Sequence, residues 1–235
     1  MEKVLGNLPQ CRSLPRMNCL VTAGPTYEPL DQVRRLTNFS TGRLGLELAE
    51  FLTARGLRVT LLIGEQATWA GPRRATEVVT FSTTADLETK LRARASGEVD
   101  AVFHAAAVSD FQFGRAFHPV PGGALEEIKA GKLSTRTGTL LVELVPTPKL
   151  LPQMRDWFPA ARITGWKYEV DGNRAAALAR AGEQLAAART DACVVNGSAY
   201  GPGFGLLTRE VCRDLANRTA LFAALLEWVA NGRIA

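Results

Sequence analysis

The chain lacks the features that mark several large classes of protein. No apolar run approaches the roughly 20 residues that a helix needs to cross a bilayer, so we expect no membrane span. The four cysteines are scattered without a C-x-x-C pair, which favours buried free thiols over a zinc site or a disulfide framework. No Ser-His-Asp or Cys-His arrangement for nucleophilic catalysis is visible, and we expect no metal ligands of the protein's own.

The common nucleotide-binding signatures are also missing. Neither the G-x-x-x-x-G-K-[ST] phosphate loop nor the G-x-G-x-x-G dinucleotide fingerprint occurs. The net charge of +5 suits an anionic partner, but the basic residues are dispersed and no nucleic-acid-binding motif is present. Residues 1–16 mix charges and prolines without an apolar segment, which predicts an irregular leader rather than a secretory signal. We therefore expect a cytoplasmic protein with one α/β domain over residues 17–235 that binds no nucleic acid.

The most informative segment joins a buried strand to a helix near the N-terminus. The apolar run at residues 19–23 predicts a strand, and apolar residues at three-and-four spacing predict a helix over residues 41–55. A long polar loop with Gly24 near its start and Gly42 near its end connects them. Ser40, Thr41 and Gly42 would offer hydroxyl and unpaired N–H donors to a phosphate at the helix start. An ordinary helix cap is the alternative.

The remaining chain alternates between strand and helix patterns. Strands are expected at residues 57–63, 78–81, 100–107, 162–167 and 192–195, with helices between them and a final helix capped by Asp214 and ending at Gly232. This alternation predicts an α/β fold with a doubly wound, mostly parallel, Rossmann-like sheet. Because ligands of such sheets bind at the carboxyl ends of strands, Gly24 and Ala107 should converge on one crevice. Residues 111–145 break the pattern and predict a hairpin excursion with arms at 125–133 and 139–145, and residues 196–205 predict a glycine-rich loop.

Five motifs in this order resemble one enzyme family. They are T-A-G-P-T-x-E-P-L-D-x-V-R-x-x-T-N-x-S-T-G (22–42), H-A-A-A-V-S-D-F (104–111), L-V-P-T-P (144–148), G-W-K-Y-E (165–169) and V-V-N (194–196). The chain resembles phosphopantothenate–cysteine ligase of coenzyme A biosynthesis. The resemblance implies that phosphopantothenate attacks the α-phosphate of CTP or ATP, that Mg²⁺ neutralises the phosphates, and that cysteine then attacks the acyl-nucleotide. It also implies a homodimer built through the 111–145 excursion and a separate decarboxylase in the pathway.

The resemblance also implies roles for individual residues. Asn38 would bind the acyl intermediate, with Arg34 one helical turn earlier in the same pocket. The nucleotide-binding candidates are Gly24, Thr26, Ser40, Thr41, Gly42, Ala106, Ala107, Asp110 and Trp166. Small residues that pack helices onto a sheet, and a core position for Trp166, are the structural alternatives. His104 lies inside a strand, where a core or supporting role is more typical than catalysis.

The family's usual K-x-K-K run is altered here. Glu127 stands at its first lysine, and Lys129 follows two residues later. In an extended segment alternate side chains share a face, so Lys129 is a candidate to reach the triphosphate. A solvated surface stretch is the alternative. The alteration leaves open an inactive nucleotide-binding homologue, whereas a nicotinamide-dependent reductase is disfavoured because G-x-G-x-x-G and Tyr-x-x-x-Lys are both absent.

Overall fold

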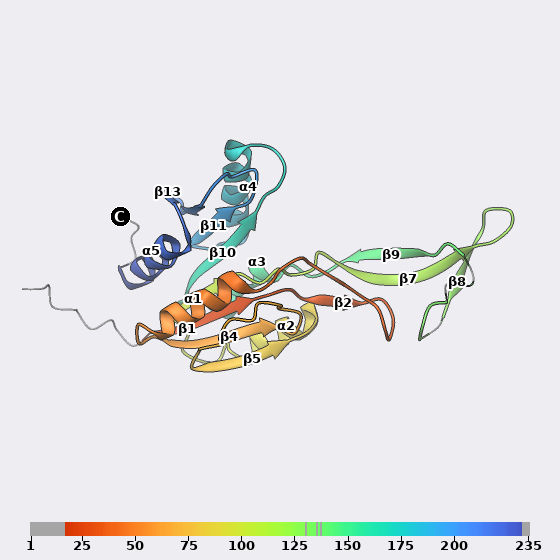
Figure 1. Cartoon of the computed structure of the whole chain (residues 1–235), viewed down its shortest axis with the longest axis horizontal. Coiled ribbons are helices and arrows are strands. Elements are labelled where there is room, and N and C mark those ends of the chain that lie inside the picture. Colours follow the sequence, from red (N-terminus) through yellow and green to blue (C-terminus); the bar gives the residue numbers. More distant parts are fainter. Residues whose placement is uncertain (1–16, 130, 135, 137, 232–235) are drawn as a thin grey trace, which may run out of the picture.

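A computed structural model describes residues 17–129, 131–134, 136 and 138–231, and its body is an eight-stranded sheet (Figure 1). The strands run in the spatial order β13-β12-β11-β10-β6-β1-β4-β5. Their bounds are β1 Asn18–Ala23, β4 Arg58–Gly64, β5 Glu77–Phe81, β6 Ala101–His104, β10 Arg162–Tyr168, β11 Ala192–Asn196, β12 Phe204–Leu207 and β13 Cys212–Leu215. Only β12 and β13 pair antiparallel to their neighbours. The expected doubly wound, mostly parallel sheet is confirmed.

Helices cover both faces of this sheet, so neighbouring residues of β1 are buried on opposite sides. Val21 packs in a cluster with α1 (Arg43–Thr53) and α5 (Arg218–Asn231), whereas the adjacent Leu20 packs with α2 (Thr84–Arg92) and α3 (Leu150–Trp157). Helix α4 (Arg174–Ala187) packs on β11. Near-continuous apolar strands of this kind are typical of parallel sheets covered on both faces. Among the described residues, no helix is long and apolar enough to cross a membrane.

A second part of the chain projects from the sheet as an arm (Figure 1). It contains the three-stranded sheet β8-β7-β9 and the hairpin β2–β3. The bounds are β2 Tyr27–Pro29, β3 Arg35–Thr37, β7 Phe111–Pro119, β8 Leu125–Ile128 and β9 Leu141–Pro146. The backbone N–H of Gln32 at the hairpin tip donates to the carbonyl of Gly131, 3.0 Å away. The tip of the hairpin is therefore joined to the segment that follows β8.

The excursion is confirmed, but its internal pairing differs from the expectation. The expected arms do not pair with each other, because β7 lies between β8 and β9 and bonds to both. The loop expected between Gly24 and Asn38 also contains the β2–β3 hairpin. The three residues of β3 are all exposed, so no alternation of buried and exposed side chains marks this strand in the sequence.

The C-terminal region needs a further correction. Asp214 lies in β13 and bonds to Tyr200 and Arg174, so it does not cap the last helix. Asn217 takes that place, because its side-chain oxygen accepts from the N–H of Ala220, 3.0 Å away. The loop expected over residues 196–205 ends in β12. The expected leader and the expected helix end at Gly232 lie outside the described residues.

Candidate active site

Strands β1 and β6 meet at the point where the strand order of the sheet reverses. From β1 the chain proceeds outward to β4 and β5, whereas β6 lies on the other side of β1 and is followed by β10 and β11. Beyond the strand ends, Ala107 donates its N–H to the carbonyl of Gly24 at 3.0 Å, and Thr26 donates to the carbonyl of Ala107 at 3.2 Å. The expected convergence of Gly24 and Ala107 is therefore confirmed, at the place where open α/β sheets bind ligands.

Asn38 fixes the segment that follows β6. Its side-chain amide donates to the carbonyls of Ala107 and Val108, at 3.3 and 3.2 Å. The two acceptors are carbonyl oxygens, so the NH₂ group must face them and Oδ1 points elsewhere. The atom of Asn38 that remains for a substrate is therefore an acceptor. Arg34 is separated from Asn38 by the extended strand β3, not by one helical turn.

The end of β6 separates two cavities. Cavity A, about 350 Å³, lies on the α1–α5 side and is lined by residues 39–45 together with Ala105, Asn196, Phe204 and Arg218. Cavity B, about 630 Å³, lies on the α3–α4 side and reaches Ala106. Adjacent residues of the strand end thus face different cavities, as the alternation of an extended chain requires. Both volumes fall in the range of small-molecule sites, roughly 300–1,000 Å³.

Cavity A is built for an anion. The N-cap of α1 is Gly42, with φ of 77°, which has no side chain to cap the helix. The N–H of Arg43 donates to Oγ1 of Thr41 at 3.3 Å, whereas no described residue accepts from the N–H groups of Leu44 and Gly45, which remain available. Arg43 and Arg218 both pair with Glu47, at 2.6 and 2.8 Å, and so place two guanidinium groups around one carboxylate. Ser40 and Thr41 line the same space. The sequence reasoning missed Arg218, which comes from the other end of the chain and carries no local motif.

Gly42 also has a packing role. A Cβ on Gly42 would lie 2.9 Å from the Cβ of Ala67 and 3.3 Å from the Cα of Gly24, and both glycines have positive φ. A side chain at Gly42 would therefore clash with the protein before it met a ligand. The glycine therefore stabilises the fold whether or not it contacts phosphate.

Cavity B is lined by side chains of both charges. Lys149 forms an ion pair with Asp110 at its rim. Glu169 forms ion pairs with Lys167, at 3.3 Å, and with Arg180, at 2.7 Å. Lys149, Lys167, Arg180, Asp110 and Glu183 all line the cavity, and together with Glu169 three carboxylates match its three cations.

Trp166 connects the two sides of the sheet. Its carbonyl accepts from Gln184, 3.1 Å away, in cavity B, while its side chain packs against the cluster on the α1–α5 side. The indole Nε1 is buried, and no described residue accepts a hydrogen bond from it. This position is compatible with the core alternative for Trp166.

The floor of cavity B contains a buried hydrogen-bonded group. His104 is 6% exposed, and its Nδ1 lies 2.8 Å from the hydroxyl of Thr22. That hydroxyl also accepts from the N–H of Ala106, 3.2 Å away. Burial lowers the pKa of His104 to about 4, so the imidazole is neutral near pH 7.

Several predicted site residues lie away from both cavities. Gly24, Thr26 and Ala107 line neither A nor B, and the buried hydroxyl of Thr26 donates to Ser109 at 3.1 Å. Arg34 lies at the tip of the hairpin, where it pairs with Asp31 at 2.8 Å and donates to the carbonyl of Leu133. Lys129 is exposed directly after β8, one of the strands of the arm. Neither Arg34 nor Lys129 lines cavity A or cavity B.

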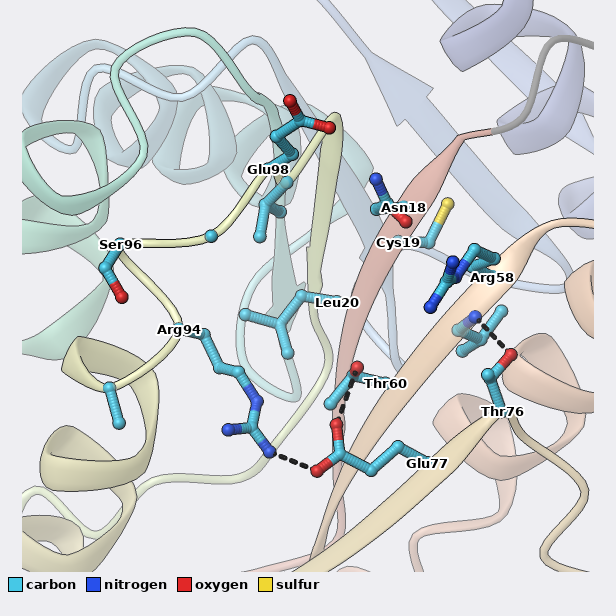
Figure 2. Close-up of a pocket in the computed structure, with 14 residues that line it drawn as sticks. Asn18, Cys19, Leu20, Arg58, Thr60, Thr76, Glu77, Arg94, Ser96 and Glu98 are labelled. Carbon is cyan, nitrogen blue, oxygen red and sulfur yellow. Dashed lines mark hydrogen bonds and ion pairs between the residues drawn. The ribbon is translucent and has the colours of Figure 1, made fainter.

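A third cavity, about 320 Å³, lies at the opposite edge of the sheet (Figure 2). It opens beside the amino ends of β1 and β4, where Asn18 and Arg58 lie. Its polar groups largely satisfy one another, since Glu77 accepts from both Thr60 and Arg94. No predicted site residue lies there. Among the described residues, no cluster of three or more His, Cys, Asp or Glu side chains could hold a metal ion.

Comparisons with known proteins identify the family of the chain. Residues 14–218 match the family described as the DNA/pantothenate metabolism flavoprotein C-terminal domain. The coenzyme A biosynthesis bifunctional protein CoaBC of Thermococcus kodakarensis is 32% identical over 186 residues, covering 79% of this chain and 42% of that protein. The CoaBC of Bacillus subtilis is 30% identical over 193 residues, covering 82% and 43%. The chain thus spans less than half the length of these two relatives.

Solved structures share the fold. The DNA/pantothenate metabolism flavoprotein from Streptococcus pneumoniae has a TM-score of 0.79 at 23% identity, covering 92% of this chain and 100% of that one. A Cab2 mutant in complex with phosphopantothenate-cysteine has a TM-score of 0.67 at 20% identity, covering 92% and 89%. The family match and the shared fold each cover most of the chain. The chain belongs to the DNA/pantothenate metabolism flavoprotein C-terminal domain family.

Proposed function

We propose that the protein is a nucleoside-triphosphate-dependent ligase that joins 4′-phosphopantothenate to cysteine. The observation that carries the proposal is the pair of cavities on either side of residues 105–106, at the reversal of strand order. A ligase of this kind must hold a triphosphate and an acyl substrate within bonding distance of each other. The names of the CoaBC relatives and the ligand of the Cab2 structure point to the same reaction class.

We assign the triphosphate to cavity A. The free N–H groups of α1 and the guanidinium groups of Arg43 and Arg218 favour negative charge there. The choice between CTP and ATP depends on the base, which these groups do not contact. Mg²⁺ usually binds through one or two carboxylates together with substrate phosphates. None of the described residues that line cavity A is a carboxylate, and Asp110 lies at the rim of cavity B in an ion pair with Lys149, so phosphate oxygens and water would hold the metal in cavity A. Bound Mg²⁺ would neutralise phosphate charge.

The reaction takes two displacements. A carboxylate oxygen of phosphopantothenate attacks the α-phosphorus, and the bond to pyrophosphate breaks. The amine of cysteine then attacks the acyl carbon, the bond to the nucleoside monophosphate breaks, and the amine loses a proton. Asn38 has its NH₂ group committed to the carbonyls of Ala107 and Val108, so we assign its Oδ1 to accept from the attacking amine.

We also propose a homodimer formed through the arm. The arm exposes apolar side chains that a monomer would leave in water: Val33, Leu36, Phe111, Leu125, Leu141, Leu144 and Val145. Arg34 and Lys129 lie on the same arm, away from their own cavities, so each would act in the site of a second copy. A cytoplasmic location and a separate decarboxylase remain parts of the proposal.

Pyrophosphate release tests the proposed function. The protein is mixed with phosphopantothenate and cysteine, with CTP and ATP in parallel. Release with at least one nucleotide, dependent on phosphopantothenate, is the expected result. Release with neither nucleotide would favour the inactive nucleotide-binding homologue, for which the exposed Glu127 at the family's lysine position is the specific observation.

A further inference from the structure

The hydrogen bonds around Thr22 determine which nitrogen of His104 carries the proton. Thr22 is fully buried, and its hydroxyl accepts from the N–H of Ala106. The same hydroxyl has one hydrogen to donate, and Nδ1 of His104 is the one acceptor that the described residues offer it. A proton on Nδ1 would leave the Thr22 hydrogen buried without a partner, which costs free energy. The imidazole therefore carries its proton on Nε2.

The second ring nitrogen of His104, Nε2, is open to solvent. The His104 side chain lines cavity B, and no described residue bonds to Nε2. Nε2 is therefore not a nitrogen that the protein seals from solvent. His104, which is only 6% exposed, thus presents one N–H without a described partner to the cavity.

We propose that His104 is a substrate-binding residue whose neutral Nε2–H donates a hydrogen bond to an oxygen atom of the phosphate-bearing substrate in cavity B. Lys149, Lys167 and Arg180 line the cavity and each pairs with Asp110 or Glu169, but their further N–H groups can donate to an anionic ligand. A neutral donor held in one orientation binds oxygen without adding a further charge to desolvate. The inference rests on the proposed function, because it takes the nucleotide or the phosphopantothenate to be that ligand.

Three variants separate substrate contact from packing. His104→Gln places an amide N–H near the position of Nε2 and keeps the donor. His104→Leu combined with Thr22→Val removes the donor together with the hydroxyl that would otherwise lose its partner. Glu88→Gln, in the middle of α2 where Glu88 is half-buried and pairs with Arg92, is a control that lines neither cavity. Circular dichroism and thermal unfolding establish that each variant is folded.

Calorimetric titration is performed with CTP, ATP and 4′-phosphopantothenate in separate arms. We expect the double variant to bind one phosphate-bearing ligand about tenfold or more weakly, and His104→Gln to bind it within about threefold of the wild type. The ligand that loses affinity identifies the source of the oxygen. Equal affinity of wild type and double variant for every ligand would overturn the inference.

Nitrogen-15 NMR of the histidine rings gives a readout that does not depend on turnover. The expected spectrum of the ligand-free protein shows a protonated Nε2 and an unprotonated Nδ1 for His104, assigned against a His118→Gln variant. A proton on Nδ1 would contradict the inference. If the wild type forms the amide product and the double variant binds every ligand as tightly as the wild type, the inference about His104 fails and the proposed function stands. If the wild type forms no product with either nucleotide, the proposed function fails, whatever the tautomer.

Discussion

Asn38 donates a hydrogen bond from its side-chain amide to the carbonyl of Ala107, 69 residues away, and so joins the segment before α1 to the segment after β6. A second bond reaches Val108. One side chain therefore fixes the backbone directly after residues 105–106, which separate the two cavities, while Asn38 itself lines neither cavity.

Replacing Asn38 by Asp should slow ligation without unfolding the protein. A carboxylate cannot donate to the two carbonyls and would repel them, so this stretch of backbone should shift. The lost contacts correspond to roughly 1–3 kcal/mol, or about 10- to 100-fold in kcat/KM. Asn173→Asp is the matched control, since Asn173 caps α4 through its oxygen and Asp caps equally well. Wild-type kcat/KM for Asn38→Asp would remove this residue from the mechanism.

Replacing Gly42 by Ala should destabilise the protein as well as weaken nucleotide binding. Positive φ in a non-glycine residue costs about 1–2 kcal/mol, and the close contact with Ala67 adds to it. Gly56→Ala separates the two causes, because Gly56 has φ of 85° and open space around its missing Cβ. Urea unfolding should show a larger loss for Gly42→Ala than for Gly56→Ala. The Ala67→Gly change should recover part of that difference, and equal losses in both single variants would contradict the packing account.

His104 makes stability depend on pH in a defined window. The unfolded chain protonates its histidines near pH 6.5, whereas the folded protein keeps His104 neutral down to about 4. The unfolded state then binds more protons, so this contribution is complete above pH 6.5 and is lost as the pH falls toward 4, by about 1.4 kcal/mol per pH unit. Urea unfolding from pH 4.5 to 7 should show a shallower slope for the His104→Leu, Thr22→Val double variant. Identical slopes would show that His104 titrates normally.

The sequence predicted the crevice but not the partners that complete it. Apolar runs mark β1 and β6 clearly, and the glycine after β1 marks the turn, so the convergence of Gly24 and Ala107 follows from general rules of parallel sheets. The exposed strand β3 has no such periodicity, and missing it gave the wrong relation between Arg34 and Asn38. Arg218 enters cavity A through tertiary packing of α5, for which no local pattern exists.

Mixed dimers test whether Lys129 acts in a second copy's site. Lys129→Ala should lower kcat/KM by about tenfold or more, a change near 1.4 kcal/mol, while Glu127→Ala should change little. A dimer with Lys129→Ala in one copy and Asn38→Asp in the other retains one intact site only if Lys129 serves the partner. Mixing the two purified variants should therefore restore activity above that of either alone. No recovery in mixtures shown to exchange subunits would place Lys129 outside the partner's site.

Oxygen-18 transfer tests the central claim most directly. Phosphopantothenate labelled in its carboxylate is incubated with the protein, cysteine and whichever of CTP or ATP supports turnover, and the products are analysed by mass spectrometry. Attack of the carboxylate on the α-phosphorus carries one labelled oxygen into the nucleoside monophosphate, so we predict one label per monophosphate formed and one retained in the amide. Label in inorganic phosphate instead of the monophosphate, or amide formation with an unlabelled monophosphate, would contradict the acyl-nucleotide mechanism.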